Sequence, residues 1–231
     1  MKRAQINTVL TTLETQKNAV STLFSSGNIS LSGHHRGLDA RILIAATQDP
    51  VRIKIEITHP WGRPLAHVLI NDAGLRLLSF PEKRLYLGQL GDPGLSRHLG
   101  ISLDPEILWS IIRAYPVLPP YHWTISPKAH QIILLAEDLK EKTVIHMGPE
   151  NRHPESLVFP RQKIQVTFSD FEYQGKLVYA RKVRAEGGDE NELGLDLETM
   201  VFNETLAPGV FKLDIPADFA IQPLSEPREG P

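Results

Sequence analysis

The fold is decided by the stretch from Pro50 to Asp72, which reads PVRIKIEITHPWGRPLAHVLIND. In its first half, branched apolar residues alternate with charged or polar ones: Val51, Ile53, Ile55 and Ile57 against Arg52, Lys54, Glu56 and Thr58. A period of two over eight residues is typical of a strand with one buried face. We therefore expect an antiparallel sheet with one apolar face and one face in water.

The alternation stops at a turn that carries a large aromatic side chain. The turn reads HPWGRP from His59 to Pro64. Proline cannot donate to a ladder and glycine tolerates positive φ, so both residues favour a turn here. A second β-type run from Leu65 to Ile70 follows. The unit is a predicted hairpin with Trp61 at its tip, where the indole either faces a membrane interface or folds back onto a neighbouring loop.

Strand-like segments recur along the rest of the chain at intervals of about 8–12 residues, as in a sandwich, a barrel or a large meander. They begin after an amphipathic helix expected over residues 3–17, which places Ile6, Val9, Leu10 and Leu13 on one face. Strands are expected at 23–31, 38–47, 51–58, 65–70, 75–80, 84–87, 121–126, 131–137, 143–147, 156–159, 163–173, 176–186 and 193–198. A closing segment is expected at 202–211. We expect one domain over residues 1–224 and a disordered polar tail at 225–231.

The strand pattern is interrupted by a second expected helix, over residues 104–115. Asp104 and Pro105 are suited to the N-cap and the first helical position. Its apolar residues are Ile107, Leu108, Trp109, Ile111, Ile112 and Tyr115. They surround the helix almost completely, so the helix is either a packed core element or a cover over an apolar surface.

Composition narrows the classes of function. The chain has 231 residues, enough for a sizeable core, and its 25 basic and 27 acidic residues argue against a nucleic-acid partner. It has no cysteine, and no run of about 18 apolar residues that could span a bilayer. The residues that follow Met1 are polar rather than those of a secretion signal, which leaves a cytosolic location or a removed targeting segment open.

Catalytic and metal-binding signatures do not stand out. The nine histidines, among them the pair His34-His35, lack metal-ligand spacing. The sequence contains no nucleophile elbow, P-loop or dinucleotide fingerprint. We therefore expect no metal, no cofactor and no catalytic residue, although a dyad assembled only in three dimensions stays open.

The order of these features resembles the LolA/LolB superfamily, which comprises the lipoprotein carrier LolA and the outer-membrane lipoprotein receptor LolB. The resemblance runs from Arg3 to about Leu224. It rests on the N-terminal helix before a long meander, the HPWG turn at 59–62, the LDP helix start at 103–105 and the FKLDIP segment at 211–216. Carriers have an arginine before the proline of the preceding turn; this chain has Asp49, which favours a receptor-like member.

The resemblance implies a mainly β fold of the α+β type, in which a strongly curved antiparallel sheet forms an incomplete β-barrel. Helices cover its concave side and enclose an apolar cavity for acyl chains. It implies that an exposed apolar residue on a hairpin turn enters the membrane, here Trp61 within the loop His59, Pro60, Trp61, Gly62 and Arg63. We expect the cavity to be lined by Ile53, Ile55, Ile57, Leu108, Trp109, Ile111 and Ile112, with Trp109 at its mouth.

The partners that the resemblance implies are acyl chains of lipoproteins or other lipids, a LolA-like periplasmic carrier and the outer-membrane surface. The location would be the periplasmic face of the outer membrane, through a lipidated cysteine that this sequence does not contain. Two alternatives stay open: an envelope-stress sensor or general lipid carrier of the same fold, and a lipid-processing enzyme with a Ser–His pair in the cavity.

Overall fold

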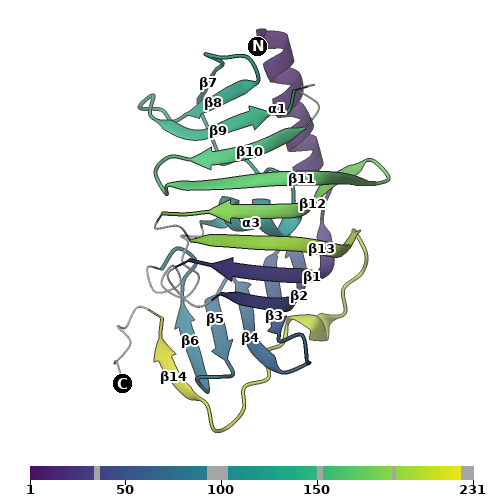
Figure 1. Ribbon diagram of the computed structural model, residues 1–231, viewed down its shortest axis with the longest axis vertical. Helices are drawn as coiled ribbons and strands as arrows, with labels where there is room; N and C mark the ends of the chain where they lie inside the picture. The colour runs from purple at the N-terminus through teal and green to yellow at the C-terminus, as the bar shows by residue number, and fades with distance from the viewer. Residues whose placement is uncertain (34–36, 93–103, 150–152, 189–190, 225–231) are drawn as a thin grey trace.

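The computed structural model describes residues 1–33, 37–92, 104–149, 153–188 and 191–224. Within these residues, fourteen strands form one curved sheet that does not close, which is an incomplete β-barrel (Figure 1). The helices among the described residues are α1 (Arg3–Asn18), α3 (Pro105–Arg113) and the short 3-10 helix η1 (Pro208–Phe211). The expected fold class is confirmed.

The first half of the sheet consists of β1 (Thr22–Ser32), β2 (Leu38–Gln48), β3 (Val51–Thr58), β4 (Pro64–Asn71), β5 (Gly74–Ser79) and β6 (Arg84–Gly88). The second half consists of β7 (Trp123–Ile125), β8 (Gln131–Leu135), β9 (Glu141–Met147), β10 (Pro154–Phe159), β11 (Ile164–Gln174), β12 (Leu177–Glu186) and β13 (Glu192–Phe202). The last strand, β14 (Ala220–Pro223), pairs with β6.

The two halves are antiparallel meanders joined along one long seam. The strand order is β14-β6-β5-β4-β3-β2-β1-β13-β12-β11-β10-β9-β8-β7. The seam is the antiparallel pair of β1 and β13, which runs from Leu23 opposite Phe202 to Ser32 opposite Glu192. The edge strands of the sheet, β7 and β14, lie at opposite ends of the molecule (Figure 1), so the sheet curves without closing.

The register of β3 explains why the isoleucines share one face. Ile55 lies opposite Ile44 on β2 and Val68 on β4. Ile53 and Ile57, two residues away on either side, are buried, and Ile55 is half-buried. Because side chains alternate along a strand, all three lie on the core side of the sheet.

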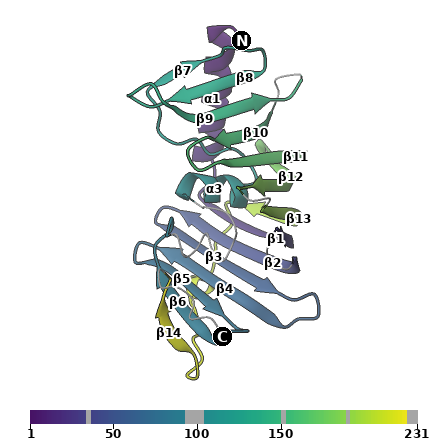
Figure 2. The same cartoon turned by 60° about the vertical axis from the view of Figure 1, so that its left-hand side comes forward.

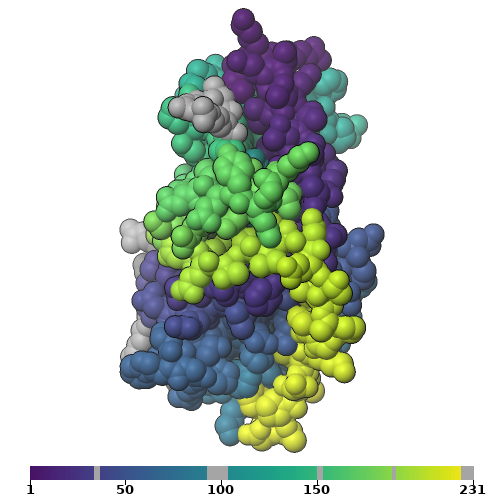
Figure 3. All heavy atoms as spheres, turned by 90° about the vertical axis from the view of Figure 1, so that its right-hand side faces the viewer, coloured from purple at the N-terminus to yellow at the C-terminus, as the bar shows by residue number. Residues whose placement is uncertain are grey.

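The opposite face of β3, which was expected to be in water, is only half-exposed, because Arg52, Lys54, Glu56 and Thr58 all have intermediate burial. The C-terminal segment runs along this part of the molecule (yellow in Figure 3), and η1 contacts β3. The guanidinium of Arg52 lies 4.7 Å from the centre of the Phe211 ring. The Lys54 side chain, in an ion pair of 2.8 Å with Glu56, keeps only 15% of its exposure. Alternation alone could not reveal this cover because η1 lies more than 150 residues further along the chain.

Helix α1 crosses the second half of the sheet and buries Ile6, Leu10 and Leu13. At its start, the amine of Met1 donates to Ser126 Oγ, just beyond β7, at 2.9 Å. In its last turn, Gln16 donates to the Lys176 carbonyl at 2.8 Å and accepts from the Val178 amide at 2.9 Å. The two ends of α1 are therefore attached to strands at different positions in the sheet.

Helix α3 lies where the two halves of the sheet meet (Figure 2) and contacts β11 and β12. Its residues Ile107, Leu108, Ile111 and Ile112 belong to the same buried cluster as the core-facing strand residues. The helix therefore lies on the concave side, as expected. It ends at Ala114, which takes a left-handed conformation with φ 52° and whose carbonyl accepts from the Ala180 amide at 2.8 Å.

The C-terminal segment differs from the expectation. Within the closing segment expected at 202–211, β13 ends at Phe202 and Pro208–Phe211 form η1. The pairing of β14 with β6 is parallel, and it was not predicted. None of the described helices is long and apolar enough to cross a membrane. The expectations for His34-His35, His98, the start of the segment at Ser102-Leu103 and the tail at 225–231 fall outside the described residues.

Candidate functional site

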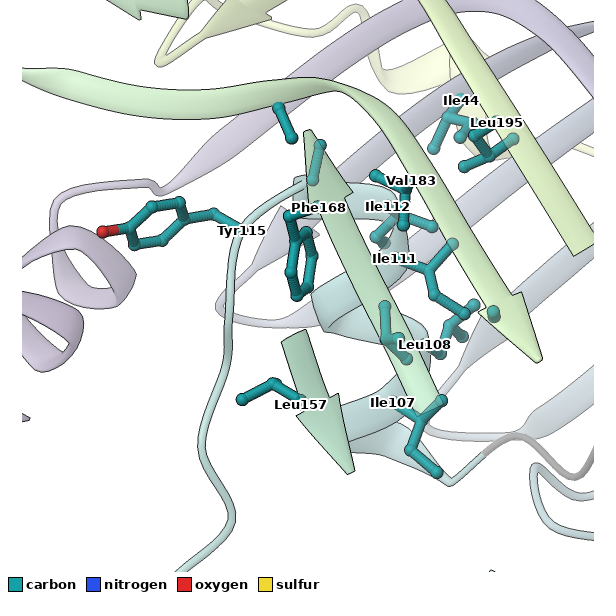
Figure 4. Close-up of a cluster of buried hydrophobic side chains, with 14 of the residues drawn as sticks. Ile44, Ile107, Leu108, Ile111, Ile112, Tyr115, Leu157, Phe168, Val183 and Leu195 are labelled. Atoms are coloured by element: carbon teal, nitrogen blue, oxygen red, sulfur yellow. The ribbon is translucent and has the colours of Figure 1, made fainter. Parts of the chain in front are cut away.

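A cavity of about 310 Å³ lies between α3 and the concave face of the sheet. The sheet contributes residues of β1 to β5 and β13, and α3 contributes Leu108, Ile111 and Ile112. Figure 4 shows these three α3 side chains in one cluster with Ile44 and Leu195 of the sheet. The helix therefore forms one wall of the cavity and the strands form the other.

The strand wall is made of apolar side chains at alternate positions. Each of six strands contributes a pair of such side chains or more. The pairs are Ile29 and Leu31, Ile42 and Ile44, Ile55 and Ile57, Val68 and Ile70, Leu75 and Leu77, and Leu193 and Leu195. Each pair stands two residues apart, so its members point to the same side of the sheet. Five of these pairs were missing from the expected site. The same alternation that revealed β3 could have found them, had the strands been assembled into one sheet.

The polar part of the lining lies at one end of the cavity, at Ser79 and Glu82. Ser79 on β5 is opposite Ala66 on β4, which in turn is opposite Ile57 on β3. This end is therefore the end of the sheet that carries the turn between β3 and β4. Glu82 accepts a hydrogen bond of 2.9 Å from the Tyr86 hydroxyl.

The structure brings together five of the seven residues expected in the cavity: Ile55, Ile57, Leu108, Ile111 and Ile112. Ile53 is 1% exposed and belongs to the packed core, outside the lining. Trp109 is not at the mouth; it lines a separate small cavity with Lys17 and Arg113. The physical reason is helix geometry, because at about 100° per residue Trp109 lies close to Arg113 around the helix and far from Leu108 and Ile111.

The turn between β3 and β4 presents its tryptophan to solvent. Trp61 is 90% exposed, and its ring centroid lies 4.9 Å from that of His59. The turn is closed by hydrogen bonds of 2.8 Å from the His59 amide to the Arg63 carbonyl and from the Gly62 amide to the His59 carbonyl. Gly62 has a φ of 86°, a conformation that glycine takes without strain. Pro60 and Arg63 are exposed as well.

The part of the chain that the structure describes holds no group of three or more His, Asp or Glu side chains arranged for a metal ion. Among those residues, the cavity lining includes Ser79 but no histidine. The arrangement can therefore enclose an apolar chain and place a polar group at its Ser79 end.

Comparison with solved structures identifies similar folds. A DUF1329 family protein from Desulfovibrio piger has a TM-score of 0.58 at 11% identity, over 89% of this chain and 96% of that one. The LolA superfamily protein from Nitrosomonas europaea has a TM-score of 0.57 at 12% identity, over 89% and 97%. A putative outer membrane lipoprotein-sorting protein domain from Vibrio parahaemolyticus has a TM-score of 0.57 at 11% identity, over 87% and 95%.

Comparison at the sequence level finds no match, either to a family model or to a curated protein. At identities of 11 to 12%, the structural likeness shows a shared fold. The class that the structure defines is therefore an incomplete β-barrel with the fold of LolA superfamily proteins and an apolar cavity under a helix.

Proposed function

We propose that this protein is a non-enzymatic lipid-binding protein that holds acyl chains, those of a lipoprotein above all, in the cavity under α3. The observation that carries the proposal is the cavity itself. Its volume of about 310 Å³ falls at the lower end of the range of ligand sites, whereas ordinary cores keep few voids larger than a water molecule.

The chemistry of the lining fits an acyl chain. The walls are branched aliphatic side chains, and each buried methylene of a ligand gains roughly 0.8 kcal/mol. The polar groups Ser79 and Glu82 gather at one end, where the ester or amide end of an acyl group could remain hydrated. A ligand with one long apolar part and one polar end matches this distribution.

The exposed tip supports a more specific role, the transfer of the bound ligand to a membrane. Trp61 lies at the same end of the sheet as Ser79 and Glu82, and indole rings concentrate at membrane interfaces. The loop of His59, Pro60, Trp61, Gly62 and Arg63 would insert first, with Arg63 near phosphate headgroups. We infer a receptor-like protein of one lipid-binding domain over residues 1–224.

The names of the structural neighbours agree with this direction. One is a LolA superfamily protein and another is a putative lipoprotein-sorting domain. By analogy, the proposed site of action is the periplasmic face of the outer membrane, and the proposed donor of the ligand is a LolA-like carrier. A general lipid carrier of the same fold would share the cavity but would not need the tip.

Mass spectrometry of lipids extracted from the purified protein tests the proposal directly. We expect acylated molecules in the wild-type sample and their depletion in an Ile55→Glu variant, in which a carboxylate enters the apolar wall. An equal yield of acyl lipid from both proteins would place any bound lipid elsewhere and contradict the proposal. Recovery of a covalently altered lipid product would instead favour an enzyme.

A further inference from the structure

Arg113, in the last turn of α3, is a buried cation with part of its hydrogen-bonding capacity unused. Its side chain is 2% exposed. Its Nη1 donates to the Val178 carbonyl at 3.0 Å, and its guanidinium lies 4.2 Å from the centre of the Phe202 ring. Within the described residues, Nε and Nη2 have no hydrogen-bond partner. Burying a charge with unsatisfied donors costs folding free energy unless an anion or another acceptor pairs with it.

The two unused nitrogens form one edge of the guanidinium. That edge, Nε together with Nη2, is the fork that takes a carboxylate or a phosphate through two parallel hydrogen bonds. Burial lowers the pKa of the Arg113 guanidinium to about 10, against the smaller opposing effect of Tyr115. The guanidinium is still a cation at neutral pH, so its fork needs an anionic or strongly polar partner.

A small cavity adjoins Arg113, and a second cation lines it. The cavity measures about 60 Å³ and is lined by Lys17, Val20, Gln48, Trp109, Arg113 and Val117. Since a water molecule occupies roughly 30 Å³ in the liquid, there is room for about two waters or for one small oxyanion. Among the described residues, neither Lys17 nor Arg113 forms an ion pair with a carboxylate.

The backbone at the end of α1 could in principle compensate the charge of Arg113, because carbonyls gather at a helix C-terminus. These carbonyls are already engaged. The Val20 amide donates to the Lys17 carbonyl at 3.3 Å. The Gln48 amide, in the orientation that satisfies its neighbours, donates to the carbonyls of Lys17 and Val20. A free anion entering the small cavity would therefore meet the cations of Lys17 and Arg113, and few carbonyls would compete with it for the Arg113 guanidinium.

We propose that Arg113 and Lys17 bind a small oxyanion, a carboxylate or a phosphate group, in the cavity between the end of α1 and α3. Leu108, Ile111 and Ile112 face the acyl cavity, whereas Arg113 and Trp109 line the small one. The oxyanion site is thus distinct from the acyl site and does not depend on it. An anion held there links the end of α1 to the end of α3.

Titration calorimetry of the full chain with inorganic phosphate and with acetate, at constant ionic strength, tests the site. We expect saturable binding of at least one of them. Lys17→Gln should weaken it about tenfold, since one charge-assisted hydrogen bond is lost. Arg113→Lys, which keeps the charge but lacks the fork, should also weaken it, and Arg113→Met should abolish it. Lys128→Gln, at an exposed lysine in the turn between β7 and β8, is the matched control.

A second measurement uses Trp109, which lines the same cavity. In a Trp61→Phe, Trp123→Phe background, the emission of Trp109 should change on saturation with the anion and should not change in the Lys17→Gln version. Palmitate separates the two sources of an oxyanion: a response to palmitate but not to acetate, lost in Lys17→Gln, means that the anion is a lipid headgroup. Failure of phosphate, acetate and palmitate to bind through Lys17 and Arg113 would overturn the proposal.

Discussion

Ile55 on β3 and Ile111 on α3 line the same cavity from different walls, one from the sheet and one from the helix that covers it. Ile55 is only half-buried, although its neighbours Ile53 and Ile57 on the same strand face are buried. The difference arises because the side chain of Ile55 meets open space where Ile53 meets packed atoms. This contrast allows ligand binding and core packing to be tested on one strand.

The first prediction separates the two roles. Ile55→Glu should lower affinity for a fatty acyl probe by at least tenfold, because a carboxylate is placed in an apolar wall, while unfolding without ligand changes little. Ile53→Ala should do the reverse: a loss of about 2–5 kcal/mol in unfolding free energy and near-normal affinity for the folded protein. Denaturant unfolding and acyl-probe titrations provide the comparison. Parallel losses in both variants would indicate a plain core without a ligand site.

The second prediction concerns the start of α3. Asp104 occupies the N-cap position without a side-chain cap, and its carboxylate accepts a hydrogen bond from the Gln162 amide, in the turn between β10 and β11. Loss of this bond should destabilise the position of α3 over the cavity by about 1 kcal/mol. Ligand release should then be roughly fivefold faster. Stopped-flow displacement of a bound acyl probe measures the rate in Asp104→Ala and Gln162→Ala.

The double variant tests whether Asp104 and Gln162 act through a single hydrogen bond. If the two residues act through one bond, the Asp104→Ala, Gln162→Ala protein should release the probe no faster than either single variant. Fully additive acceleration would mean that the two side chains influence α3 independently.

The local elements could be read from the sequence because their signals are local. The alternation from Val51 to Thr58 gives β3 with its bounds, and Asp104 and Pro105 mark the start of α3. The strand β14 could not be predicted, because it has only four residues and lacks alternation. It forms by pairing with β6, where Ala220 lies opposite Arg84. No local pattern encodes a pairing between segments so far apart.

The site could be predicted only in part for the same reason. Ile55 and Ile57 followed from periodicity, but the Leu193 and Leu195 wall depends on the pairing of β13 with β1. Trp109 was misplaced because a helix that is apolar nearly all round does not reveal which face meets the cavity. The burial of Arg113 was invisible, since a charged residue at a helix C-terminus ordinarily indicates a solvated end.

The third prediction concerns pH and follows from His67 on β4. Burial lowers the pKa of His67 below its ordinary 6.5, with Glu56 and Asp214 opposing the shift and Lys54 adding to it. The unfolded chain therefore binds a proton more readily than the folded one. The stability that the neutral ring contributes is fully present above pH 6.5 and is lost as the pH falls through 6.5 toward the lower folded value.

Thermal unfolding between about pH 8 and pH 5 measures this dependence. The ring of His67 contacts Phe80 with centroids 4.9 Å apart, so His67→Phe keeps an aromatic contact and removes the titration. We expect a flatter decline of Tm with falling pH in His67→Phe. His122→Gln, at an exposed histidine, should leave the wild-type slope unchanged. A slope that is the same in His67→Phe would show that other groups control the acid response.

The last prediction concerns Trp61, whose ring is 90% exposed on the turn between β3 and β4. Full insertion of one indole buries on the order of 150–250 Å², worth at most about 4–6 kcal/mol at roughly 25 cal/mol per Å². That suits a transient membrane contact. Trp61→Glu should therefore leave unfolding and acyl-probe uptake as in the wild type, while it abolishes transfer of the bound probe into liposomes. Trp123→Gln, at a tryptophan that is 59% exposed on β7 at the far edge of the sheet, should transfer normally. Normal transfer by Trp61→Glu would make the tip a structural turn, and an equal defect in both variants would show that any exposed tryptophan supports membrane contact, independent of the end of the sheet that carries Ser79 and Glu82.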